Sequence, residues 1–143
     1  MARASHFELF DHTADLGIRV TAPTPADLVP AAVDGLYAAI GELRPTGGAA
    51  GEPWAFERRA VEPSLAVRDL LQSLIVLFES RQAMVRELVV EAFDEHRLSV
   101  TGRAVPVDGA ASALLREVKA VTYHGLLLRP VSGGFEAEFI VDI

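Results

Sequence analysis

The densest group of chemically capable side chains in the sequence lies between Asp11 and Asp15. Two carboxylates, the imidazole of His12 and the hydroxyl of Thr13 occur within this short stretch. The residues that follow alternate apolar and polar side chains, which is the period of a half-buried strand. Strand pairing would hold the backbone beside this cluster, so the position suits a metal ion or a charged ligand. The alternative is that Asp11 and Thr13 only cap and bend a turn.

A second polar stretch lies late in the chain, over residues 117–124. It carries Lys119, Thr122, Tyr123 and His124 within a strand-like segment that breaks at His124 and the following glycine. Each of His12 and His124 is interpreted first as a structural histidine that hydrogen-bonds to the backbone. A functional role for either imidazole is the alternative.

The end of the chain is the third candidate, because an apolar strand continues to the last residue, Ile143. Chain ends usually fray, so a β-branched last residue without a polar tail suggests that its carboxylate is held in place. The carboxylates of Asp15 and Asp142 are oxygen ligands, which suit Ca²⁺ or Mg²⁺ better than zinc.

Composition excludes several other kinds of site. The 143 residues contain no cysteine, which excludes disulfides, thiolate metal sites and a cysteine nucleophile. The net charge of −7 argues against direct nucleic-acid binding, which usually needs a basic surface. No phosphate-binding glycine loop, HExxH or GxSxG motif occurs. Without an apolar run of ~20 residues or a secretory leader, we expect a soluble, cytoplasmic protein with no membrane association.

The first predicted helix has clear start and stop signals. Thr24 is a suitable N-cap, Pro25 suits the first helical position, and Asp27 completes a capping box. Gly41 predicts the end of this helix. Pro30 is expected to kink it, because proline removes one backbone hydrogen bond.

A second helix is predicted to begin at Pro63, and its broad apolar face indicates a central, buried position. That face comprises Val67, Leu70, Leu71, Leu74, Ile75 and Phe78, widened by Leu77. We expect strands at residues 7–10, 16–20, 55–62, 88–93, 98–104, 118–128 and 135–142, a loop over 44–53 and a short helical turn over 110–116. The sequence therefore predicts an α+β fold: one domain, residues 1–143, with a largely antiparallel β-sheet and two main helices packed on it.

The three polar stretches together resemble the archease family. The family's HTAD[IL]G motif corresponds to residues 12–17, its EVKA[IV]TYH motif to residues 117–124, and its terminal aspartate-isoleucine to Asp142 and Ile143. The order and spacing of the motifs match along the whole chain. The sequence departs from the family pattern at Pro30, in the Gly- and Ala-rich loop at 45–53, and in the less charged segment 108–112.

The resemblance implies a metal-binding protein cofactor of the RtcB-type RNA ligase, which joins RNA ends in tRNA splicing and RNA repair using GTP. Such a protein promotes guanylylation of the ligase and so permits multiple turnover; it is not itself an enzyme. The implied cation is Ca²⁺, with Mg²⁺ as the alternative. The implied metal ligands are Asp15, Asp142 and the carboxylate of Ile143. The residues implied to surround the metal or face the ligase are His12, Lys119, Thr122, Tyr123 and His124.

Two other functions remain open from the residues alone. One is a small metal-dependent hydrolase that uses His12 or His124 as general base. The other is an interaction domain in which the metal is purely structural.

Overall fold

The computed structural model describes residues 5–12 and 15–143. Its elements in chain order are β1 (His6–His12), β2 (Asp15–Ala22), α1 (Pro25–Ile40), β3 (Gly41–Glu42), β4 (Glu52–Arg59), α2 (Pro63–Arg81), β5 (Ala83–Phe93), β6 (Arg97–Pro106), β7 (Ala113–Leu114), β8 (Ala120–Val121), β9 (Leu127–Val131) and β10 (Gly134–Asp142). No helix in the described ranges is long and apolar enough to cross a membrane.

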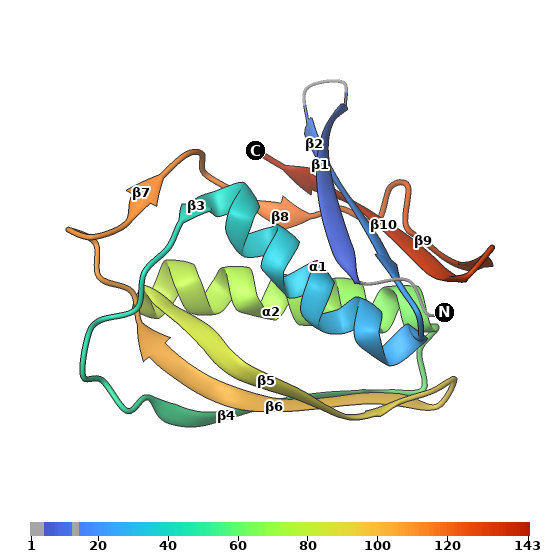
Figure 1. The fold of residues 1–143 in the computed structure, drawn as a ribbon, viewed down its shortest axis with the longest axis horizontal. Coiled ribbons are helices and arrows are strands. Elements are labelled where there is room, and N and C mark those ends of the chain that lie inside the picture. Colours follow the sequence, from blue (N-terminus) through green and yellow to red (C-terminus); the bar gives the residue numbers. More distant parts are fainter. Residues whose placement is uncertain (1–4, 13–14) are drawn as a thin grey trace.

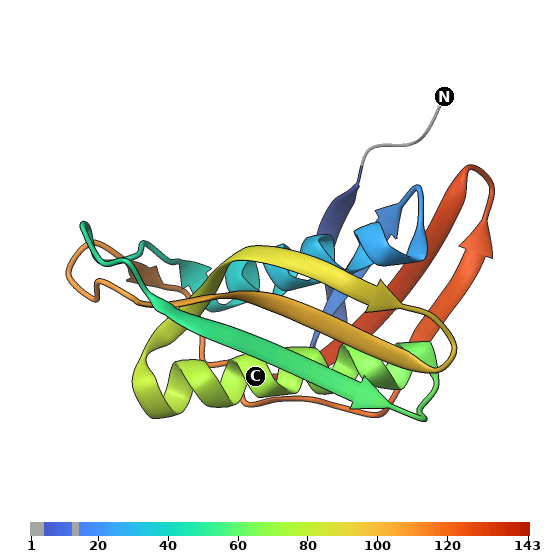
Figure 2. The same cartoon turned by 90° about the horizontal axis from the view of Figure 1, so that it is seen from below.

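The strands form two main sheets and one short pair, and every strand pairing found is antiparallel. One sheet has the order β1-β2-β10-β8, with β9 also paired to β10; the second has the order β4-β6-β5; β3 pairs with β7. The helices α1 and α2 lie between the two main sheets (Figure 1), and the three-stranded sheet crosses in front of both helices when seen from below (Figure 2). The predicted α+β class is confirmed, although the strands divide into separate sheets.

The helix α1 begins and ends where the sequence predicts. Thr24 is its N-cap, and the Thr24 hydroxyl accepts a hydrogen bond of 3.2 Å from the backbone N–H of Asp27. Gly41 follows the last helical residue, and its N–H donates to the carbonyl of Tyr37. The helix continues through Pro30, so the missing N–H of this proline does not end it.

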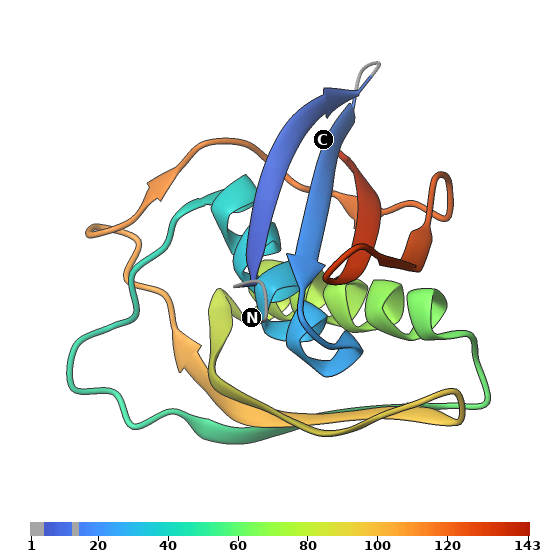
Figure 3. The same cartoon turned by 45° about the vertical axis from the view of Figure 1, so that its right-hand side comes forward.

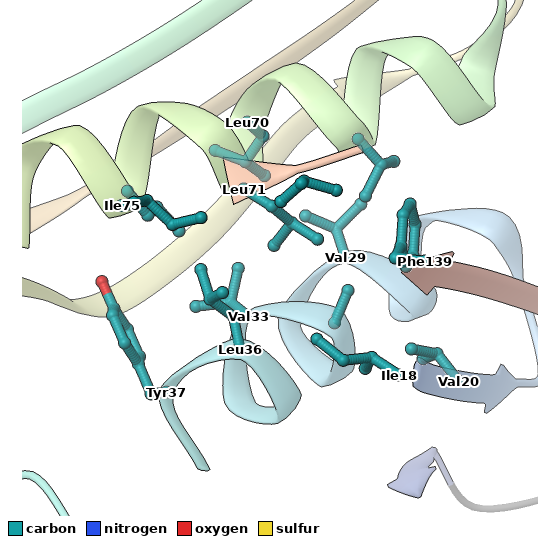
Figure 4. Packing of buried hydrophobic residues seen from close by; sticks show 14 of the residues in the cluster. Ile18, Val20, Val29, Val33, Leu36, Tyr37, Leu70, Leu71, Ile75 and Phe139 are labelled. Atoms are coloured by element: carbon teal, nitrogen blue, oxygen red, sulfur yellow. The ribbon is translucent and has the colours of Figure 1, made fainter. Parts of the chain in front are cut away.

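The core forms where the two helices meet the sheets. Each helix contributes a face of fully buried aliphatic side chains because its apolar residues recur at helical spacing. Phe78, predicted on the same face of α2, is only partly buried, beside a cavity of about 350 Å³. Figure 4 shows this packing, with Leu70, Leu71 and Ile75 from α2, Val29, Val33 and Leu36 from α1, and Ile18, Val20 and Phe139 from the five-stranded sheet.

Several predicted elements differ in position or type. The strand expected at 88–93 begins earlier, at Ala83, and the strand expected over 118–128 is limited to β8 and the start of β9. The strand expected at 55–62 is β4, which begins at Glu52 and ends at Arg59. It can include Pro53 because β4 is an edge strand, paired with β6 and with no other of the described strands. The strand ends where Ala60 adopts a φ of 59°, in the left-handed region.

The helical turn expected at 110–116 is also wrong. Residues 113–114 form β7 and pair with β3, and the Leu115 N–H donates to the carbonyl of Ile40 at 2.9 Å. These backbone hydrogen bonds to the end of α1 keep the segment extended. Local sequence preference is thus overridden by pairing with a distant part of the chain.

Candidate functional site

Strand pairing places Asp15 and Asp142 at the same end of the five-stranded sheet. The pairing of β2 with β10 ends at Leu16 and Val141, so Asp15 and Asp142 are the next residues along these neighbouring strands. Leu16 and Val141 are buried against the helices. Because side chains alternate along a strand, both aspartates belong to the opposite, outer face of the sheet.

Lys119 and Ile143 lie at the same end. The backbone N–H of Lys119 donates to the carbonyl of Asp142 at 2.7 Å, and the Lys119 side chain is exposed. Ile143 follows β10 directly and is 38% exposed. The C-terminus lies beside the β1–β2 hairpin in both Figure 1 and Figure 3.

The segment that carries Thr122, Tyr123 and His124 interrupts an edge strand. Both β8 and β9 pair with β10, and residues 122–126 form the turn between them. The Thr122 hydroxyl accepts a hydrogen bond from the backbone N–H of His124 at 3.2 Å. Gly125, with a φ of 70°, supplies the left-handed conformation in this turn. The predicted break at His124 and Gly125 is therefore confirmed.

Tyr123 and His124 are exposed, but they lie farther along β10 than Lys119 does. The N–H of Thr122 donates to the carbonyl of Ile140 at 2.9 Å, two residues before Asp142. The structure thus brings Asp15, Asp142, Lys119 and Ile143 to one sheet end, and it places the Tyr123 turn along the adjacent edge. Both Asp15 and His124 have interaction partners in the structure.

Part of the first motif lies outside what the structure describes. Thr13 and Ala14 are outside the described residues, and so is the side chain of His12. The backbone of His12 pairs with Asp15 at the end of the β1–β2 hairpin. The predicted role of the His12 imidazole therefore stays a prediction.

The donor chemistry at this sheet end fits a hard cation, although the described side chains do not complete a site. No group of three or more His, Asp or Glu side chains close enough to hold a metal occurs within 5–11 and 15–143. The two aspartates and the carboxylate of the final residue are all oxygen donors, as Ca²⁺ and Mg²⁺ prefer. The metal and its ligands stay a prediction.

The outer face of the hairpin carries its own fixed charges. Arg19 on β2 donates to Glu138 on β10 at 2.8 Å and also pairs with Glu8 on β1. The hydrogen bond to Glu138 is the main reason why the pKa of Arg19 lies above its usual value. The guanidinium also lies 4.5 Å from the centre of the Phe10 ring. These contacts tie β1 to β2 and β10, the two strands that carry Asp15 and Asp142.

Sequence analysis missed two residues of α2 that contact the 117–124 segment. Arg68 donates to the carbonyl of Val121 and lies over the ring of Tyr123, while Gln72 accepts from the N–H of Val121. The sequence did contain a signal that could have identified them: Arg68 and Gln72 are long polar residues one helical turn apart, beside the apolar face of a helix predicted to be buried.

Arg68 is itself held by a charged neighbour. Its guanidinium donates to Asp69 at 2.9 Å, and Asp69 also accepts from Arg58 on β4 at 2.8 Å. Partial burial acts to raise the pKa of the Asp69 carboxyl, but the hydrogen bonds from Arg58 and Arg68 outweigh it and hold this pKa below its usual value. Asp69 is therefore charged at neutral pH and links β4 to Arg68.

Comparisons with known proteins agree on one family. Residues 7–143 match the model of the Archease protein family (MTH1598/TM1083). The chain is 26% identical to the protein archease of Methanosarcina barkeri, covering 99% of each chain. It is 30% identical to the protein archease of Methanopyrus kandleri, covering 96% of this chain and 99% of that one. These names specify no enzymatic reaction.

Two solved structures share the fold. The solution structure of Methanobacterium thermoautotrophicum protein 1598 has a TM-score of 0.73 and 19% identity, covering 96% of this chain and 98% of that one. The crystal structure of TM1083 from Thermotoga maritima, described as an archease and possible chaperone, has a TM-score of 0.64 and 19% identity, covering 95% and 96%. With the family model matched along nearly the whole sequence, the chain belongs to the archease family.

Proposed function

We propose that this protein is a cytoplasmic protein cofactor of an RtcB-type RNA ligase. It promotes guanylylation of the ligase and so permits multiple turnover in tRNA splicing or RNA repair. The observation that carries the proposal is the register of β2, β10 and β8, which brings part of each archease motif to one end of one sheet. Phosphoryl transfer depends mainly on positioning and on charge stabilisation, which a protein that presents a cation can supply.

Asp15 and Asp142 would hold the cation, with the carboxylate of Ile143 as third ligand. Opposed residues on antiparallel strands have Cβ atoms about 4.5–5.5 Å apart, and Ca²⁺ takes oxygen ligands at about 2.3–2.6 Å. Two carboxylates projecting from one face can therefore reach a shared ion. At ~6 Å and an effective dielectric constant of ~20, two such charges repel by roughly 3 kcal/mol, so a divalent cation would stabilise the folded protein. Ca²⁺ is the proposed ion, and Mg²⁺ is the alternative.

Lys119, Tyr123 and His124 would face the ligase, with Thr122 shaping the turn that presents them. All three side chains are exposed, and Tyr123 is 67% exposed. The imidazole of His12 would lie near the metal, as the family resemblance implies. RNA would contact the ligase and not this protein, because the chain is acidic.

The direct test measures ligation and GMP transfer by a cognate ligase with and without the purified protein. We expect stimulation of the ligase, and neither ligation nor GTP hydrolysis by the protein alone. Asp15→Asn and Asp142→Asn should each abolish most of the stimulation. The matched control is Asp34→Asn, which neutralises an exposed aspartate on α1. Robust hydrolysis by the isolated protein without any effect on the ligase would instead favour the hydrolase with His12 or His124 as base.

A separate measurement tests the cation. Ca²⁺ at about 100 times its dissociation constant should stabilise the protein by about 2.7 kcal/mol, and the two asparagine variants should lose most of this gain. A short extension after Ile143 would convert its carboxylate to an amide, so it should reduce the gain, whereas an extension before Met1 should not. Equal gains in both extended forms would remove Ile143 from the ligand set. A metal-induced gain with no effect on any ligase would favour a purely structural metal.

A further inference from the structure

Among the described residues, β8 has a strand partner on one side only, and two side chains of α2 take the place of a partner on its other side. β8 pairs with β10 on one side, through Val121 and Val141, and ends the strand order of its sheet. The N–H of Val121 donates to Oε1 of Gln72 at 2.9 Å, and its carbonyl accepts from Nε of Arg68 at 2.9 Å. An edge strand usually leaves such groups to water or to another chain. Here both backbone groups of one residue are satisfied by a helix.

The two side chains are coupled to each other and to the rest of the fold. Arg68 and Gln72 lie one turn apart on α2, and Nη2 of Arg68 donates to Oε1 of Gln72 at 3.4 Å. The third nitrogen of the guanidinium donates to Asp69, which also binds Arg58. The side chain of Arg68 is only 12% exposed. The guanidinium is thus held from several directions.

Arg68 also fixes the orientation of Tyr123. Its guanidinium carbon lies 4.0 Å from the centre of the Tyr123 ring, a cation–π distance, and yet Tyr123 is 67% exposed. An exposed aromatic side chain that is already immobilised loses little freedom when a partner binds it. Tyrosines in this situation are typical anchors of protein interfaces.

We propose that Arg68 and Gln72 are positioning residues, which hold Val121 and Tyr123 in the arrangement that the ligase binds. The role of the partner rests on the proposed function, whereas the positioning itself can be measured on the protein alone. Neither residue touches the reacting groups in this proposal. Both act through the backbone of β8 and the ring of Tyr123.

The test uses three variants and one control. Gln72→Leu removes the acceptor for Val121, and Arg68→Met removes the guanidinium but keeps an unbranched side chain. Gln72→Glu keeps an acceptor oxygen and serves as the conservative rescue. The control is Arg103→Met, because the guanidinium of Arg103 on β6 also donates to the backbone, here to the carbonyls of Ala50 and Gly51, both at 2.8 Å.

Three quantities are measured for each protein: the exchange rate of the Val121 amide, the concentration that gives half-maximal ligase stimulation, and the maximal stimulation. Gln72→Leu and Arg68→Met should speed exchange of the Val121 amide and raise the half-maximal concentration about tenfold. At saturating concentrations of either variant, the maximal stimulation of the ligase should equal that of the wild type. Gln72→Glu should behave like the wild type. The control Arg103→Met can lower thermal stability but should leave the half-maximal concentration unchanged.

Each contrary outcome is distinct. Unchanged exchange at Val121 in both Gln72→Leu and Arg68→Met would overturn the positioning role. An unchanged half-maximal concentration in these variants, or an equal rise in the control, would overturn the role in partner binding. Absence of any stimulation by the wild type would overturn the proposed function, while the exchange measurement would still decide whether Arg68 and Gln72 position the segment.

Discussion

Replacing Gly17 with alanine should destabilise the hairpin that carries Asp15, because the Phe10 ring lies across this glycine. Phe10 and Gly17 are paired residues of β1 and β2, and a Cβ at Gly17 would overlap the far edge of the Phe10 ring. The ring would have to move, and it also supports the guanidinium of Arg19 at 4.5 Å. Overpacking typically costs about 1–3 kcal/mol, and losing an exposed cation–π contact adds about 0.5–1 kcal/mol.

These costs sum to about 1.5–4 kcal/mol, and alanine in place of glycine in a strand returns roughly 0.5–1 kcal/mol, so the expected net loss is about 0.5–3.5 kcal/mol. For a chain of this size each kcal/mol corresponds to roughly 3 °C in melting temperature, so Gly17→Ala should melt about 2–10 °C below the wild type. Thermal melting followed by circular dichroism measures this directly. Denaturant unfolding supplies the free energy independently.

A double-mutant cycle with Phe10→Ala isolates the cause. Removing the ring removes the three atoms nearest to a Cβ at Gly17, and alanine in a strand is more stable than glycine by roughly 0.5–1 kcal/mol. The effect of Gly17→Ala should thus change sign in the Phe10→Ala background. If Gly17→Ala costs the same in both backgrounds, the Phe10 ring is not what requires glycine at this position.

Three further predictions concern the core and the first helix. Tyr37→Phe should cost about 1–3 kcal/mol in denaturant unfolding, because the N–H of Val85 donates to the Tyr37 hydroxyl at 2.8 Å and would lose its partner in a buried site. Burial raises the pKa of Tyr37 to about 12 from an ordinary 10.0. The hydroxyl therefore ionises at lower pH in the unfolded chain than in the folded protein. The free energy of unfolding of the wild type should be unaffected by this group below pH 10 and should fall by up to about 2–3 kcal/mol as the pH rises toward 12. Tyr37→Phe has no such hydroxyl and should not show this fall. Thr24→Ala should lower the free energy of unfolding by about 1 kcal/mol, because it removes the cap on α1. Thr24→Ser keeps a hydroxyl at this position and should keep most of the stability that the cap provides.

The elements that sequence analysis predicted well are those determined by local chemistry. The limits of α1 follow from the hydroxyl of Thr24 and the flexibility of Gly41, which act within one helical turn. The apolar face of α2 follows from helical spacing alone, and all its predicted members except Phe78 are buried. Such features need no knowledge of the rest of the fold.

The elements that failed depend on pairing between distant residues. Local preference suggested a helical turn at residues 110–116, but the end of α1 supplies hydrogen bonds to Leu115 and Arg116 through the carbonyl of Ile40. The closeness of Asp15 and Asp142 has the same origin, because it follows from the register of two strands at opposite ends of the chain. Pattern and spacing could identify both aspartates as candidate ligands, but only the family resemblance predicted that they belong to the same site.

Arg68 shows why a helical periodicity can hide a site residue. A charged residue beside an apolar stripe is usually placed in solvent, yet the Arg68 side chain is 12% exposed and bonded to the backbone of Val121. That position makes sense only once β8 is known to be a two-residue strand that ends the strand order of its sheet in the described part of the chain. The side chains of Arg68 and Gln72 close this edge to pairing with another chain, while the turn that follows stays exposed at Tyr123 and His124. Because side chains and not a further strand cover the edge of β8, the turn at residues 122–126 stays accessible to a partner.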